Sequence, residues 1–222
     1  MTTIDLTDRY HIARYMRGGL AVWTLDRGDF PVEAGILHHS AGTYGGVVLD
    51  ADSPETVERD QLDALARDHY ARFGIAIGYH YVLFPSGRLY AVGKWGTQRA
   101  HVKGRNPITT QRWNIDAIGI VAFGDFEKEA AGEALREAIE SAVAEVRDIA
   151  GERVPVHGHG LTPTVNSAGV KYRQGTMCPG RNLLPMVGRL NAQTETDWTD
   201  TLAHIETARD ELDAVEAALL AS

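Results

Sequence analysis

The sequence predicts an α/β fold in which helices pack on a mixed central β-sheet, with an additional helix at the C-terminus. Short apolar stretches rich in β-branched residues alternate with two long segments of helical periodicity. A Pro-Ser-Gly turn at residues 85–87 separates two of the apolar stretches, which predicts a hairpin. This alternation of element types, with a hairpin among the strands, indicates a mixed sheet covered by helices.

The first predicted elements are a strand and a helix. Residues 34–41 (AGILHHSA) form an apolar run that ends in polar residues, which is typical of a short strand. A helix is expected over residues 50–74, where Ser53 is the predicted N-cap and Pro54 occupies the first helical position. Gly74 is the stop signal of this helix. Its apolar stripe consists of Val57, Leu62, Leu65, His69 and Phe73.

Four further strands and a second long helix follow. Residues 79–93 predict two strands around the turn, and residues 114–124 predict another, because they are rich in β-branched residues and too short for a buried helix. An amphipathic helix is expected over residues 127–151, ended by Gly151, before a last short strand within residues 152–160. The apolar face of this helix consists of Leu135, Ile139, Val143, Val146 and Ile149.

The chain divides into a main domain and a tail. We expect one main domain over residues 1–190, including an N-terminal extension of about 30 residues, and a helical tail over residues 191–222. Two interpretations of the tail stay open: a helix docked on the domain of a monomer, or a helix that joins two copies into a dimer. The apolar residues of the tail recur at helical spacing and are Leu202, Ile205, Ala208, Leu212, Val215 and Leu219.

Composition excludes several classes of protein. The chain carries 22 basic and 30 acidic residues, a net charge of −8, which argues against binding to nucleic acid by phosphate neutralisation. A single cysteine cannot form an intrachain disulfide. No run of about 18 apolar residues predicts a membrane span, and the first residues resemble no secretory signal. We therefore expect synthesis in a cytoplasm, so that a target outside would be reached only after release by another factor.

Histidines at strand ends could combine with the single cysteine. His38 and His39 end the first predicted strand, His157 and His159 end the last, and Cys178 follows in the next loop. Ligands gather at strand ends in α/β sheets, and two histidines with one cysteine leave one tetrahedral position open, as in catalytic zinc sites. Imidazole and thiolate donors favour zinc over magnesium or calcium. Scattered structural histidines and a buried structural cysteine are the alternative interpretation.

The order of several fragments resembles a known family. The fragments ILHHSAG, GYHYVLFPSGRLY, RAHVKGRN, AIGIVAFG, GHG and TMCPG occur in this order within residues 34–185. Together they resemble the zinc-dependent type 2 N-acetylmuramoyl-L-alanine amidases, which include bacteriophage endolysins and animal peptidoglycan recognition proteins. The resemblance implies that zinc binds to His38, His159 and Cys178.

The resemblance also implies roles for residues around the metal. Tyr79 would place its hydroxyl near the reacting water, and the Thr176 hydroxyl would bind a developing oxyanion. His101 would lie in the substrate cleft, and His39 is expected to line the cleft rather than to bind the metal. A basic loop with Arg99, Lys103 and Arg105 suits a stem peptide that carries carboxylates, although it could equally be a solvated loop.

Two departures from the family pattern affect the site. Leu161 stands two residues after the second ligand histidine, where most members have an acidic residue. The loop between that histidine and Cys178 is much longer than usual, so we expect the insertion over residues 162–174 to bulge beside the cleft and to shape substrate choice. The longer loop leaves the choice between His157 and His159 open, and the Gly-His pairing favours His159.

The resulting hypothesis is a zinc-dependent peptidoglycan hydrolase. It would cut the amide bond between N-acetylmuramic acid and L-alanine of the stem peptide, as the endolysin of a phage or prophage that lyses its bacterial host. The alternatives are an intracellular amidase that recycles muropeptides and a non-catalytic peptidoglycan-binding module. Cys178 argues against both, because recycling amidases tend to use Asp at its position and inactive recognition proteins typically lose the cysteine.

Overall fold

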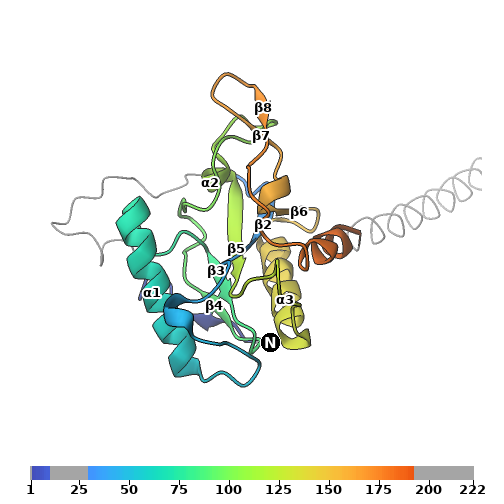
Figure 1. Cartoon of the computed structure of the whole chain (residues 1–222). Coiled ribbons are helices and arrows are strands. Elements are labelled where there is room, and N and C mark those ends of the chain that lie inside the picture. Colours follow the sequence, from blue (N-terminus) through green and yellow to red (C-terminus); the bar gives the residue numbers. More distant parts are fainter. Residues whose placement is uncertain (1, 11–29, 193–222) are drawn as a thin grey trace, which may run out of the picture.

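The computed structural model describes residues 2–10 and 30–192, and at its centre is a mixed β-sheet (Figure 1). Its strand order is β1-β4-β3-β5-β2-β6, and each neighbouring pair is parallel except β3 with β4. The antiparallel pair is the predicted hairpin, so the prediction of a mixed sheet is confirmed. The strands are β1 (Ile4–Asp5), β2 (Ala34–His39), β3 (Tyr81–Leu83), β4 (Leu89–Ala91), β5 (Ala117–Ala122) and β6 (Val156–Gly158).

Two long helices cover opposite faces of this sheet (Figure 1). Helix α1 spans Glu55–Phe73 and helix α3 spans Glu133–Ala150. Successive strand residues alternate between the two cores that result: Tyr81 packs in the cluster under α3, whereas Val82 packs in the cluster under α1. Burial on both faces explains why β5 is apolar at every position rather than at every second one.

The ends of α1 and α3 match the sequence prediction only in part. Gly74 ends α1 in a left-handed conformation with φ of 72°, and its N–H bonds to the carbonyl of Tyr70, as predicted. The prediction of Ser53 as N-cap is wrong, because Pro54 takes that position and the Ser53 hydroxyl instead accepts the backbone N–H of Asp50. The predicted apolar stripes also run too far, since the last members, Phe73 and Ile149, are exposed where the helices end.

One further helix and an edge strand complete the described chain. Residues 184–192 are helical. Together with Leu183, which directly precedes them, they extend the core under α3 through Met186, Val187 and Leu190. Strand β1 belongs to the N-terminal extension and pairs with the outer edge of β4. The predicted tail stripe from Leu202 to Leu219 lies outside the described residues, so the tail helix and its role in a dimer stay predictions.

Shorter elements lie around the central sheet. They are α2 (Trp113–Asp116), the 3₁₀ turns η2 (Tyr44–Gly46) and η3 (His159–Leu161), and the antiparallel strands β7 (Thr164–Val165) and β8 (Lys171–Tyr172). The β7-β8 hairpin is formed by the insertion predicted over residues 162–174. Arg105 exchanges two backbone hydrogen bonds of 3.0 Å with Val165, which attaches the hairpin to the basic loop.

No helix within residues 2–10 and 30–192 combines the length and apolar character that crossing a bilayer would require.

Candidate metal centre

Strand register brings two of the predicted ligands together. In the parallel pair β2-β6, Ile36 lies opposite His157 and Leu37 lies opposite Gly158. The next position on β2 is His38, and the next residue after β6 is His159. Their ring centroids lie 4.5 Å apart. His157 stands two positions earlier along the strand, where its ring centroid lies 6.0 Å from that of Trp113. Of the two candidates, His159 is the one beside His38.

The cysteine completes a compact group of donor atoms. One ligand atom each from His38, His159 and Cys178 lies within 4.8 Å of the other two. The Cys178 sulfur is 3.6 Å from Nδ1 of His38 and also accepts the backbone N–H of His39 at 3.4 Å. His38 and Cys178 are buried, and His159 is half-buried. The three residues that the sequence predicts as metal ligands therefore meet at one point.

Glycine allows the cysteine loop to approach η3. The N–H of Gly160 donates to the carbonyl of Cys178 at 2.6 Å. A Cβ atom at Gly160 would lie only 2.2 Å from the carbonyl oxygen of Thr176, so any other residue would push the loop away. The second glycine of the Gly-His-Gly motif is thus required by the close approach of two backbone segments that both carry ligands.

The second ring nitrogen of His38 also has a partner. Nε2 of His38 lies 3.2 Å from Nδ1 of His101. If His38 donates from Nε2, its Nδ1 presents a lone pair toward Cys178, which is how metal-binding histidines are usually oriented. His101 is itself fixed, because its backbone N–H donates to Asn114 Oδ1 at 2.9 Å and its ring packs on Gly119 of β5.

Burial sets the protonation of the donor atoms. Burial, followed by the neighbouring His159 and His101, holds the pKa of His38 well below its usual value, and burial lowers that of His159 to about 4. Both imidazoles are therefore neutral at pH 7 and have lone pairs to offer. Burial raises the pKa of the Cys178 thiol to about 12, so the thiol needs a nearby cation to ionise.

These donors fit zinc. Two neutral imidazoles and one cysteine sulfur match the nitrogen and sulfur ligands that zinc prefers, and three protein ligands leave a fourth position for water or substrate. A bound dication would also supply the charge that the buried Cys178 thiolate requires.

Tyr79 and Thr176 flank the centre. The Tyr79 ring lies 5.0 Å from that of His38 and 5.4 Å from that of His69, which accepts the backbone N–H of Gly78 at 2.8 Å. Burial raises the pKa of Tyr79 above its usual value, so its hydroxyl stays protonated and can donate. The Thr176 oxygen accepts the backbone N–H of Cys178 at 3.1 Å, which leaves its hydroxyl proton for another acceptor.

Besides His101, which lies behind His38, two residues expected to contact substrate point away from the donor atoms. His39 follows His38 on β2 and therefore points to the opposite face, where its Nδ1 accepts the N–H of Phe126 at 3.2 Å. Arg99 is only 1% exposed and donates to the carbonyl of Ile77 at 3.3 Å, and burial lowers its pKa to about 10. The sequence pattern places Arg99 in a basic loop, but the structure uses it to satisfy interior oxygens.

The insertion supplies a residue that sequence analysis did not single out. The Gln174 amide donates to the carbonyl of Lys103 at 2.9 Å and to the Thr164 hydroxyl at 2.6 Å. Its side chain also interacts with His159, where it partly offsets the effect of burial on the pKa of that histidine. Lys103 is exposed, and its charge further lowers the pKa of His159, so Lys103 does lie near the centre. No motif marks Gln174, and only its position just before the cysteine loop could have suggested it.

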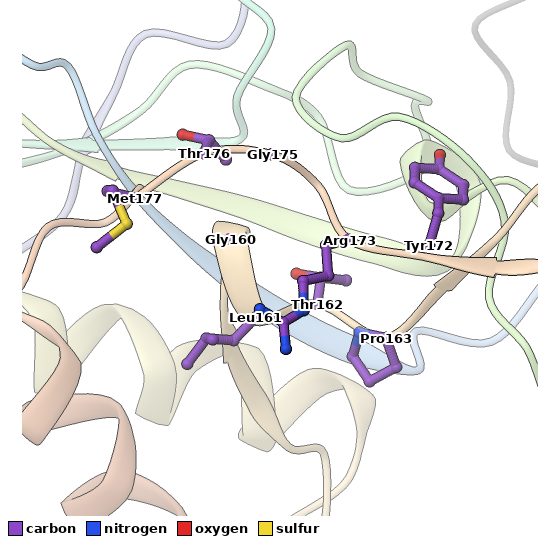
Figure 2. Close-up of a pocket in the computed structure, with 9 residues that line it drawn as sticks. All are labelled: Gly160, Leu161, Thr162, Pro163, Tyr172, Arg173, Gly175, Thr176 and Met177. Atoms are coloured by element: carbon purple, nitrogen blue, oxygen red, sulfur yellow. The ribbon is translucent and has the colours of Figure 1, made fainter.

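A pocket of about 580 Å³ opens beside Thr176 (Figure 2). The η3 turn forms one wall, and the chain that leads from β8 to Cys178 forms the other. The lining residues are Gly160, Leu161, Thr162, Pro163, Tyr172, Arg173, Gly175, Thr176 and Met177. The insertion therefore shapes a hollow directly next to the candidate metal centre.

Comparisons with known proteins agree with the fold described above. Residues 28–181 match the profile of a family described as N-acetylmuramoyl-L-alanine amidase, and no curated protein sequence matches the chain. Bumblebee PGRP-SA is 18% identical, with a TM-score of 0.58 over 84% of this chain and 93% of that chain. The amidase LysC from Clostridium intestinale is 15% identical, with a TM-score of 0.52 over 88% and 98%. The Ph2119 endolysin of a Thermus scotoductus bacteriophage is 18% identical, with a TM-score of 0.54 over 86% and 99%. At these identities, the likeness shows a shared fold.

Proposed function

The chain belongs to the N-acetylmuramoyl-L-alanine amidase family, and from this premise we propose that it is a zinc-dependent peptidoglycan hydrolase. The bond cut is the amide between the lactyl group of N-acetylmuramic acid and the first L-alanine of the stem peptide. The observation that carries the proposal is the convergence of His38, His159 and Cys178 within 4.8 Å of one another. This ligand set is incomplete as a structural zinc site and typical of a catalytic one.

The proposed zinc ion and the protein side chains have different roles in the reaction. Bound zinc would supply a nucleophilic water at neutral pH and would polarise the amide carbonyl. The protein holds His38 in the orientation that frees Nδ1 for the metal, because His101 occupies the other ring nitrogen at 3.2 Å.

Two hydroxyl groups serve the reacting amide. Thr176 donates a hydrogen bond to the carbonyl oxygen as negative charge develops there, since its own oxygen is already oriented by the Cys178 N–H. Tyr79 stays protonated and donates a hydrogen bond toward the reacting groups from the other side of His38. Both side chains are partly buried, and hydrogen bonds shielded from water are stronger than exposed ones.

A non-catalytic binding module is less consistent with the site. A module that only binds peptidoglycan does not need the complete set of donors, the tautomer fixed by His101 and the protonated Tyr79. We therefore favour catalysis.

We further propose an endolysin that acts on the wall of its bacterial host after release from the cytoplasm. The fold neighbours include a bacteriophage endolysin, which supports this role. The test is expression in bacteria: cells should stay intact until the inner membrane is permeabilised, and should then lyse. Cells that stay intact after permeabilisation would favour the recycling amidase instead.

Mass spectrometry of digested peptidoglycan tests the activity itself. Purified cell wall incubated with zinc-loaded protein should release stem peptides with a free N-terminal L-alanine and glycan strands with intact lactyl carboxyl groups. EDTA-treated protein and Cys178→Ser should release neither product. Protein that sediments with the wall without releasing fragments would be a binding module, and fragments with other new ends would identify a different bond.

A further inference from the structure

We propose that the pocket beside Thr176 binds the stem peptide of the substrate, and that Arg173 recognises a carboxylate of that peptide. The inference rests on the proposed function, because it places the scissile amide at the candidate metal centre. It goes beyond that function by assigning a peptide subsite to the insertion between His159 and Cys178, and by naming its specificity-determining residue.

The pocket has fixed walls. On the hairpin side, the Tyr172 ring packs so closely on Gly104 that a Cβ there would lie 2.1 Å from the Tyr172 hydroxyl oxygen. Gln174 holds the following stretch against Lys103 and Thr164 by the two hydrogen bonds described above. Arg173 stands between these two anchored residues, so its backbone position is set by both neighbours.

The lining carries one sign of charge. Arg173 is the only charged residue among those that line the pocket, and no carboxylate lies on the lining to neutralise it. Within residues 2–10 and 30–192, no ion pair involves Arg173, and its side chain is exposed. A guanidinium in this state is available to a carboxylate, which it can bind through two parallel N–H bonds.

The rest of the lining suits a peptide chain. Leu161 is 67% exposed and Met177 is 65% exposed, so apolar surface borders the cation on the open side of the pocket. Pro163 also lines the pocket, and in Figure 2 it lies on the other side of Thr162 from Leu161. Apolar contact combined with a single charged anchor is typical of sites that bind small ligands in one orientation.

The charges of the substrate indicate that the pocket binds its peptide part, not its sugars. The sugar rings of peptidoglycan are neutral, and the lactyl carboxyl of muramic acid is consumed in the amide bond that the enzyme cuts. Carboxylates therefore occur only in the stem peptide. The nearest to the scissile bond belongs to the residue after L-alanine, a γ-linked D-glutamate. Thr176 lies both at the pocket and two residues from Cys178, so a peptide that leaves the metal centre on this side passes Arg173.

Peptide binding tests the assignment without requiring catalysis. The zinc-loaded full chain is titrated with the free tripeptide L-Ala-γ-D-Glu-L-Lys and with its form amidated at the D-glutamate carboxylate, and NMR shifts are followed. The free acid should bind about tenfold more tightly than the amide and should shift the signals of Leu161, Thr162 and Arg173. Arg173→Gln should remove this preference, whereas Lys171→Gln, a charge change on the same hairpin but outside the pocket, should keep it.

A second variant tests whether the positive charge of the pocket causes the preference for the acid. Leu161→Glu adds a carboxylate to the pocket and should weaken binding of the acid while leaving the amide nearly unaffected. Equal affinity of the wild type for acid and amide, undetectable binding of either, or a preference unchanged in Arg173→Gln would overturn the assignment. So would shifts of the pocket signals by a stem-free glycan fragment instead. Failure of the proposed function is seen separately, as intact peptidoglycan after incubation with the wild type.

Discussion

Nε2 of His38 lies 3.2 Å from Nδ1 of His101, so one proton shared by these two buried rings decides which nitrogen of His38 faces the cysteine. His101 was expected to contact substrate in the cleft. The structure instead puts it behind a candidate ligand, with its own Nε2 buried and without a hydrogen-bond partner in the described part of the chain. We interpret His101 as a residue that positions His38 for metal binding.

Removing the His101 ring should weaken metal binding. His101→Ala should lower zinc affinity by about 10- to 100-fold, because His38 loses the acceptor that orients it. His101→Asn should retain most of the affinity, since the Asn side-chain oxygen can occupy the place of Nδ1. Competition with a chromophoric chelator measures both. Wild-type affinity in His101→Ala would show that His38 needs no such partner.

The two histidines after β6 should behave differently. His159→Ala should remove most bound zinc, because it deletes one of the three donors that lie within 4.8 Å of one another. His157→Ala should keep about one zinc per chain, because the His157 ring contacts Trp113 rather than the donors. Metal analysis of the purified variants decides between them, and the opposite pattern would move the ligand to His157.

Zinc binding should release about one proton per ion at pH 6. The pKa of the Cys178 thiol is raised to about 12, so this thiol is protonated before binding and ionised after it. The pKa of His159 is lowered to about 4, and that of His38 lies well below its usual value, so neither has a proton to lose. Zinc affinity should consequently rise about tenfold per pH unit above pH 6.

Calorimetry in two buffers with different ionisation enthalpies measures this release. Histidines with ordinary pKa values near 6.5 would be largely protonated at pH 6 and would bring the total above two protons. A count of about two or more would therefore contradict the assignment of neutral, buried imidazoles.

Tyr79→Phe should separate chemistry from metal binding. The variant should keep its zinc and its fold, because the ring that packs between His38 and His69 is retained. The rate of peptidoglycan cleavage should fall at least about tenfold with the lost hydroxyl. Turnover equal to the wild type would make Tyr79 a packing residue only.

Most of the sheet could be predicted because local patterns and tertiary context agree there. The local residue pattern favours a single structure in three places: the hairpin turn, the apolar strand β5 and the left-handed position at Gly74. Residue types at strand ends indicated a zinc site, and the family resemblance assigned its three ligands. The family profile confirms that resemblance. The choice of His159 over His157 depends on strand register, which sequence alone does not specify.

Two wrong predictions share a cause, because tertiary contacts determine the structure at both positions. Ser53 has the chemistry of an N-cap, but its hydroxyl is taken by the turn at Asp50. Arg99 has the composition of a surface loop but satisfies interior oxygens. The helix over residues 184–192 follows a readable signal, because Leu183, Met186, Val187 and Leu190 recur at helical spacing, yet no element is predicted there from the sequence.

The N-terminal strand has a practical consequence for shortened versions of the protein. Leu6 donates its N–H to the carbonyl of Ala91 at 2.8 Å, and Thr3 and Tyr10 bond to Glu145 of α3 and Asp63 of α1. Trimming this segment would bare the hydrogen-bonding groups along the outer side of β4, and unpaired strand edges recruit strands from other molecules. A version that begins near the family match at residue 28 would therefore be prone to aggregate, so solubility screens should keep the first ten residues.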